Sequence, residues 1–243
     1  MKIDPREVAE LACAQHGAPR LDMYAGIHKA LRAFMADTLL GLGRLDVDDD
    51  LELSQGGERV LQLLDFCRAH LQHENDFVHP AMEARAPGSS SGVASEHAGH
   101  ESDIDALAAS VAQLRACPPA ARPAAAQALY RQLALFVAHN FEHMHTEETQ
   151  HNQVLWAHYS DAELMALHNA LVASIPAPDM ALVLRWLVPF MAPAERLALL
   201  TDMRAHAPAP AFAAALDTVQ PHLTGAEWHK LVRDLGMAAA PVH

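Results

Sequence analysis

Apolar residues recur every three or four positions along four long stretches of the chain, with polar residues between them. This spacing places the apolar residues on one face of a helix, which the fold must then bury. No segment shows the sustained alternation of apolar and polar residues that is typical of a strand. The pattern predicts an all-α protein, an antiparallel up-down-up-down four-helix bundle with a small helical C-terminal appendage. The predicted long helices cover residues 21–43, 56–84, 96–116 and 122–158.

Glycine, proline and short polar runs mark the boundaries of these elements. A short helix is expected between Asp4 and Gln15, and the segment APGSSSGVAS at 86–95 is expected to be a flexible connector. After Pro176 the chain is broken repeatedly by proline, which predicts about four shorter helices. We therefore predict a bundle domain with the short N-terminal helix, residues 1–175, and a small helical subdomain, residues 176–243. The subdomain is expected to pack on the bundle, cover one end of it or mediate self-association.

The middle of each apolar stripe is polar, and a histidine stands there in all four long helices. The stripe of the second helix runs through Val60, Leu63, Cys67, His70, Glu74, Phe77 and Ala81. The stripe of the fourth runs through Leu129, Leu133, Phe136, Asn140, His143, Glu147, Gln150 and Val154. A glutamate follows the histidine one turn later on both. The polar residues predicted to face the bundle core are His28, His70, Glu74, His97, His143 and Glu147.

Burying four imidazoles and two carboxylates in an apolar core is costly unless they are paired or bind metal. A metal centre would satisfy all six groups together, and the alternative is a polar core in which they satisfy one another. Imidazole nitrogen with carboxylate oxygen suits iron, manganese or zinc, whereas the lack of cysteine at these positions disfavours a thiolate site. Six residues are too many for one tetrahedral zinc ion. Because a carboxylate can bridge two ions, the set suits a dinuclear site.

Other polar residues lie near or off these stripes. Three roles are left open for Glu101, one turn after His97: a seventh ligand, a hydrogen-bond partner of a ligand, or a solvated acid. His100 lies on an apolar edge of the same helix. Tyr24 lies on the core stripe of the first helix. The favoured interpretation is a buried tyrosine whose hydroxyl is hydrogen-bonded within the protein, and the alternative is contact with a ligand or a bound small molecule. His139 is expected beside the site or near the surface. The histidines off the stripes, expected at the surface, are His73, His79, His145, His151 and His158.

Four motifs resemble the hemerythrin-like, or HHE, cation-binding domain over about residues 21–160: HKALR at 28–32, H-x-x-x-E at 70–74 and 97–101, and HMHTEE at 143–148. The resemblance implies an antiparallel four-helix bundle around two non-haem iron ions with an oxo or hydroxo bridge, with zinc or manganese as alternatives. It implies one histidine each from the first and third helices. From the second and fourth it implies a histidine and a bridging glutamate, so the ligands correspond to the six core-facing residues.

Two positions depart from the oxygen-carrying members of that family. They have a second histidine one turn along the third helix, where this chain has Glu101. Their fourth-helix carboxylate is an aspartate five residues after the histidine, whereas Glu147 is four residues after His143. Glu148 keeps the five-residue spacing and is the alternative ligand. The chain therefore resembles bacterial hemerythrin-like and iron-cluster-repair proteins more than oxygen carriers.

Charge and composition exclude several classes of protein. The formal net charge of −13 argues against nucleic acid and anionic membrane surfaces as partners. Cys13, Cys67 and Cys117 have no C-x-x-C spacing and fit reduced thiols. The N-terminal segment lacks the apolar run of a secretion signal, and no apolar stretch is long enough to cross a membrane. A cytoplasmic location is expected.

The first functional hypothesis is a binding protein whose irons take oxygen, nitric oxide or a peroxide for sensing, storage or stress response. Neutral imidazoles stabilise ferric iron less than an all-carboxylate site does, which favours reversible binding. The alternatives are a di-iron enzyme of the peroxidase or nitric oxide reductase type, and an iron storage or delivery factor. The C-terminal helices are expected to form a homo-oligomer or, in a delivery factor, to dock a partner protein. Since loading requires neutral imidazole, acidification toward a pKa of about 6.5 should weaken it.

Overall fold

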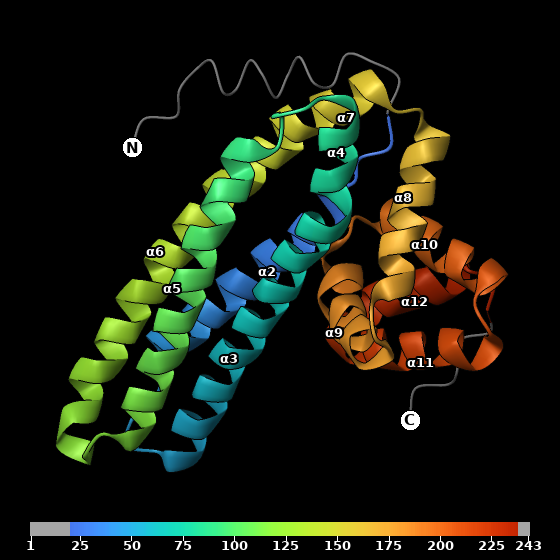
Figure 1. The fold of residues 1–243 in the computed structure, drawn as a ribbon. Coiled ribbons are helices and arrows are strands. Elements are labelled where there is room, and N and C mark those ends of the chain that lie inside the picture. The colour runs from blue at the N-terminus through green and yellow to red at the C-terminus, as the bar shows by residue number, and fades with distance from the viewer. Residues whose placement is uncertain (1–19, 238–243) are drawn as a thin grey trace, which may run out of the picture. The chain divides into compact units, whose positions relative to one another are not determined.

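The structure, a computed structural model, describes residues 20–237. Every regular element in that range is a helix, and no strand occurs between residues 20 and 237, so the prediction of an all-helical protein is confirmed (Figure 1). The short helix expected between Asp4 and Gln15 lies outside the described residues, as does Cys13.

Four long helices correspond to the four amphipathic stretches. Helix α5 packs against both α3 and α6 (Figure 1). Helix α2 meets α3 through the rings of Phe34 and Phe66, which lie edge to face with centroids 5.9 Å apart. The apolar stripes form the core, in which Leu63, Ile104 and Leu133 are fully buried. The elements are α2 Ala25–Gly43, α3 Asp50–His73, α5 Ser91–Ala116, the 3-10 turn Pro119–Ala121 and α6 Arg122–Thr146.

Two of the long helices begin earlier than the apolar pattern predicts. Helix α3 starts at Asp50 because the carboxylate of Asp49 accepts hydrogen bonds from two backbone N–H groups of the first turn. Helix α5 starts at Ser91, inside the segment expected to be a flexible connector. Val93 is buried there, one turn before His97, so packing favours helix in a stretch whose composition indicates a loop.

The second and fourth helical stretches each pass through one π-helical segment. After α3, the segment η1 Glu74–Val78 leads into α4 His79–Arg85. After α6, the segment η3 Glu147–His151 leads into α7 Asn152–His158. Both π segments begin at a glutamate, and the glutamate's carbonyl accepts a hydrogen bond from the N–H five residues later. Such insertions are rare and occur often at functional sites.

The extra residue in each π segment moves the inward face of the following turns by one position. The predicted continuation of the stripes through Phe77 and Ala81, and through Gln150 and Val154, is therefore wrong: Gln150 is exposed and the other three are half-buried. The residues buried beyond the two glutamates are Val78, His79, Met82, His151, Asn152 and Leu155.

Helix α8, Asp161–Ser174, packs Leu164 into an apolar cluster with residues of α4 and α7. The hydroxyl of Tyr159 donates a hydrogen bond to the backbone carbonyl of Ala81 at 2.6 Å. The guanidinium of Arg85 donates to the Glu163 carboxylate at 2.5 Å. These contacts hold together the turns that follow the two π segments.

A second compact unit consists of Gly26–Ala33 of α2 and the chain from Ser174 onward, and the later stretch has its own apolar core. The guanidinium of Arg196 is buried there and donates to the backbone carbonyls of Val188 and Pro189 at 3.0 and 2.9 Å, which offsets the cost of burying its charge. The described chain after Ser174 contains the four shorter α-helices that the sequence predicts: α9 Ala177–Leu187, α10 Pro193–His206, α11 Ala209–Val219 and α12 Gly225–Asp234. The 3-10 turns Val188–Phe190 and Gln220–His222 follow α9 and α11.

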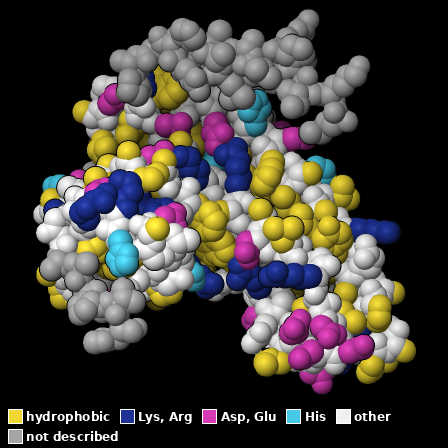
Figure 2. Space-filling view, turned by 180° about the vertical axis from the view of Figure 1, so that it is seen from behind, with side chains coloured by type: hydrophobic (Ala, Val, Ile, Leu, Met, Phe, Trp, Pro, Cys, Tyr) yellow, Lys and Arg dark blue, Asp and Glu magenta, His cyan; other side chains and the backbone are white. Residues whose placement is uncertain are grey.

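The acidic excess of the chain is distributed unevenly over its exterior. Carboxylates gather at one tip of the long helices (Figure 2), where the start of α3 and the loop before it expose Asp46, Asp48, Asp49, Asp50 and Glu52.

Among the described residues no single helix is long and apolar enough to span a membrane. The bent pair Asp161–Ser174 and Ala177–Phe190 meets that test of length and composition only when its two helices are taken together.

Candidate metal centre

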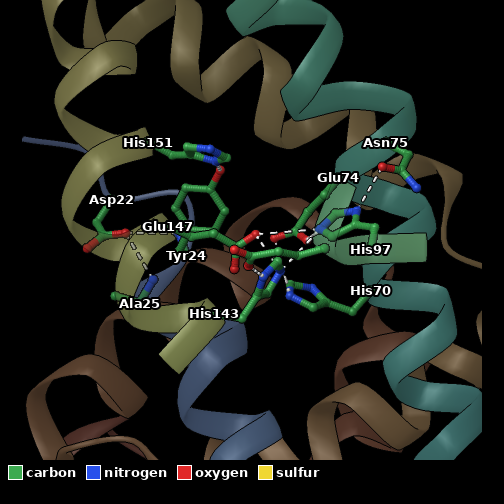
Figure 3. A network of polar contacts seen from close by, with 11 residues as sticks. Asp22, Tyr24, Ala25, His70, Glu74, Asn75, His97, His143, Glu147 and His151 are labelled. Carbon is green, nitrogen blue, oxygen red and sulfur yellow. Dashed lines mark hydrogen bonds and ion pairs between the residues drawn. The ribbon is translucent and has the colours of Figure 1, made fainter. Parts of the chain in front are cut away.

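The polar residues predicted on the four core stripes converge inside the protein. Figure 3 shows five of the six: His70, Glu74, His97, His143 and Glu147. Each long helix contributes one histidine, and each π segment contributes the glutamate that begins it. Five of the six residues are 0–4% exposed, and the sixth, His70, has a side chain that is 11% exposed. The buried five are His28, Glu74, His97, His143 and Glu147.

The six residues form two groups that share both glutamates. His28 and His70 belong to one group, and His97 and His143 belong to the other. Within each group, one potential ligand atom per residue lies within 4.8 Å of all the others. Because the two glutamates belong to both groups, each could bridge two cations, and each cation would then have two imidazoles of its own.

The distances between these groups match those of a coordination shell. The two oxygens of Glu74 face different histidines: Oε1 lies 3.3 Å from His70 Nε2, and Oε2 lies 3.5 Å from His97 Nε2. Glu147 Oε1 lies 3.3 Å from His143 Nε2 and 3.9 Å from His97 Nε2. The Nε2 atoms of His97 and His143 are 3.2 Å apart. Two nitrogens bound to one cation at about 2.0–2.1 Å would lie roughly 3.0–3.4 Å apart.

Two hydrogen bonds turn these imidazoles toward the glutamates. The Nδ1–H of His97 donates to Oδ1 of Asn75 at 2.8 Å (Figure 3). The Nδ1–H of His143 donates to Oε2 of Glu96 at 2.8 Å. Each bond fixes the tautomer and leaves Nε2 with its lone pair facing inward. Histidines that bind metals commonly have such a partner on the second nitrogen.

The electrostatics of the site favour positive charge between the two glutamates. Burial raises the pKa of Glu74 well above its ordinary value, and the neighbouring carboxylate of Glu147 raises it further. Burial alone would lower the pKa of His143, but its interactions with Glu147 and Glu96 outweigh that effect and the pKa is raised. Two cations would supply the missing positive charge, and the nitrogen and oxygen donors suit iron, manganese or zinc. The residues present therefore fit a pair of metal cations.

Two histidines that the stripes place at the surface are buried, and for them the prediction is wrong. His79 is 6% exposed and His151 is 2% exposed. In an uninterrupted α-helix, His79 would lie about 140° around the axis from Glu74. The five-residue hydrogen bond of the π segment returns it to the inward face. No residue spacing marks a π segment, so sequence reasoning could not find His79. His151 stands four residues after Glu147, and that spacing places it on the same face even of a regular helix, so its position could have been found. Of the other histidines expected at the surface, His158 is exposed and His73 and His145 are half-buried.

The residues whose role the sequence left undecided lie outside the two groups of candidate ligands. Glu101 and His139 are exposed, and Glu148 is half-buried. Among the described residues, neither Glu101 nor Glu148 belongs to a set of converging metal-ligand atoms. His100 is buried, and its ring meets that of His143 edge to face at 4.7 Å. It therefore packs against a candidate ligand.

Tyr24 lies beside the site, 1% exposed. Its hydroxyl forms a hydrogen bond with Nδ1 of His151 at 3.2 Å (Figure 3), so the structure has the satisfied core hydroxyl that the sequence favours. Burial, followed by the charges of Glu74 and Glu147, raises the pKa of the phenol well above its ordinary value, so the hydroxyl keeps its proton.

Comparison with known proteins gives one match. The family model described as the Hemerythrin HHE cation binding domain matches residues 20–152, which is more than half of the chain and includes all six candidate ligands. No curated protein and no solved structure matches the chain significantly.

Proposed function

Because this chain belongs to the hemerythrin HHE cation-binding domain family, we propose that it holds two iron ions and binds oxygen, nitric oxide or a peroxide at them. One observation carries the proposal: Glu74 and Glu147 each belong to both groups of converging ligand atoms. A polar core in which the side chains merely satisfied one another would not need two carboxylates at the boundary of two imidazole pairs.

Different side chains would have different roles in binding the two ions. Glu74 presents one oxygen to each side and would tie the two ions together. Glu147 belongs to both groups of ligand atoms and would also be shared between the ions. Asn75 and Glu96 hold two of the imidazoles in position. Burial excludes bulk water from these groups, which strengthens their interaction with cations. When bound, iron would supply redox chemistry and a coordination position for the small ligand.

The surrounding fold fits this role. We propose that α2, α3, α5 and α6 form an antiparallel four-helix bundle around the site, and the packing of α5 against α3 and α6 supports it. We also propose a boundary near residue 175 between this domain and a helical subdomain, which the separate core of the second compact unit supports. The imidazole-rich donor set favours reversible ligand binding over rapid iron oxidation.

The test is purification of the full chain without chelator, followed by metal analysis and optical spectra before and after exposure to oxygen and nitric oxide. The proposal expects two irons per chain and absorption bands that appear with the ligand and disappear when it is removed. Steady-state consumption of peroxide or nitric oxide would show an enzyme, and transfer of iron to an acceptor would show a delivery factor. A chain that retains no iron and binds none on reconstitution would contradict the proposal.

A further inference from the structure

Two buried histidines near the cation pair have no role in holding it. His79 and His151 each lie at the far end of a π segment, five residues after Glu74 and four residues after Glu147 respectively. Their rings meet edge to face with centroids 5.6 Å apart, and the ring of His79 stacks on that of His97 at 4.9 Å. Two helices therefore deliver a further imidazole each to the same side of the pair.

These two imidazoles converge on a carboxylate of the site already described. One potential ligand atom each from His79, His151 and Glu147 lies within 4.8 Å of the other two, and all three side chains are buried. Two imidazoles with one carboxylate make a common ligand set for first-row transition metals. The set is chemically complete without any of the other histidines.

Each of the two imidazoles has a nitrogen that could bind an ion. The hydroxyl of Tyr24 bonds Nδ1 of His151, which leaves Nε2 as the nitrogen available to a ligand (Figure 3). The Nε2 atom of His79 is buried and has no hydrogen-bond partner in the described part of the chain. A buried nitrogen of this kind is uncommon unless a water or an ion satisfies it.

We propose that His79, His151 and Glu147 form a third cation position, for a divalent first-row transition metal such as zinc or ferrous iron. The inference rests on the proposed function in one respect: Glu147 serves the pair and the third position together. Two buried carboxylates leave an excess of positive charge with two divalent ions, and a third ion must enter against that excess. It is therefore held most weakly of the three, by about tenfold or more. Tyr24 acts on the third position only, by fixing the orientation of His151.

The experiment counts ions in the metal-free full chain by equilibrium dialysis against Co²⁺, with the visible absorption of the bound ion as a second readout. The wild type is expected to bind three equivalents, the last of them most weakly. The double variant His79→Gln/His151→Gln is expected to bind two with unchanged affinity. The control His158→Gln changes an exposed histidine of α7 and is expected to bind three.

A further variant separates loss of the site from loss of the fold. Tyr24→Phe removes only the hydroxyl and is expected to weaken the third equivalent by about 10–100-fold without affecting the first two. If the wild type and the double variant both bind two equivalents, a water lies between the histidines; the third position is then refuted and the cation pair stands. Three equivalents in the double variant would also refute it. Fewer than two in the wild type would refute the pair, and the third position with it.

Discussion

The substitution Glu74→Gln tests whether the Glu74 carboxylate is shared by two cations or binds only one. Glu74 belongs to both groups of ligand atoms, so its loss should weaken both tightly held cations and not one. His70 belongs to one group only, and His70→Gln should therefore release one cation and leave its neighbour in place. A glutamine has the shape of glutamate but lacks the charge that would join two cations.

The size of the effect follows from linkage between binding and folding. A cation present at 100 times its dissociation constant stabilises the folded chain by about 2.7 kcal/mol, so two independent cations add about 5 kcal/mol. For a protein of this length, each 1 kcal/mol raises the melting temperature by about 2–4 °C, which gives a metal-induced shift of about 10–20 °C in the wild type. The shift should fall to about half in His70→Gln and close to zero in Glu74→Gln.

Without metal, Glu74→Gln should stabilise the folded chain. Glu74 and Glu147 are buried beside one another, and without cations the pair must retain a proton to avoid two adjacent charges. In Glu74→Gln, the amide that replaces the carboxylate could donate to Glu147 without that proton. Metal-free Glu74→Gln should therefore be more stable than the metal-free wild type, by about 1 kcal/mol or more.

The assay is thermal unfolding followed by circular dichroism, with and without added ferrous iron under anaerobic conditions, together with metal analysis after dialysis. His158→Gln, an exposed change on α7, serves as the control and should match the wild type in both states. Retention of one cation at wild-type affinity by Glu74→Gln would refute the shared carboxylate. So would a metal-free variant less stable than the metal-free wild type.

Four further predictions follow from the same structure. Glu96→Gln should weaken cation binding by about 10–100-fold without unfolding the chain, as competition with a chelator would measure, because the amide cannot hold its imidazole partner as strongly. Bound metal should be lost when the solution is acidified, since protons compete with the cations for the imidazoles; constant metal content down to about pH 5 would contradict this. The pKa of Glu163 is lowered to about 2 by hydrogen bonds from Arg85 and Ser160, so the stability that it contributes is present above its ordinary pKa of 4.5 and lost as pH falls toward 2. Urea unfolding of Glu163→Gln should then differ from wild type at neutral pH and converge with it in acid. Burial raises the pKa of Cys67 to about 12, so peptide mapping should find that thiol reagents at about pH 8 label it only in the unfolded chain.

Helical periodicity was sufficient to predict the secondary structure of the long helices and the residues that meet in the site. Residues three or four apart share a helix face whatever the tertiary context, so His143 and Glu147 could be assigned to the same stripe as Leu133. The starts of α3 and α5 could not be predicted from periodicity. They depend on the cap formed by Asp49 and on the burial of Val93, which the apolar pattern does not contain.

The position of His79 could not be predicted, for a different reason, whereas the four-residue spacing between Glu147 and His151 does indicate a shared face. A π segment adds one residue to the turn and moves every later side chain around the axis, yet no composition or spacing marks where this occurs. Stripe reasoning was therefore reliable up to Glu74 and Glu147 and wrong directly beyond them, where the third ligand group lies.

Anomalous diffraction at the iron edge, from crystals of protein purified without chelator, would show whether two cations share the two glutamates. We expect two strong peaks within about 4 Å of each other, both in contact with Glu74 and Glu147. A single strong peak, or peaks on opposite sides of the bundle with no shared carboxylate, would contradict it.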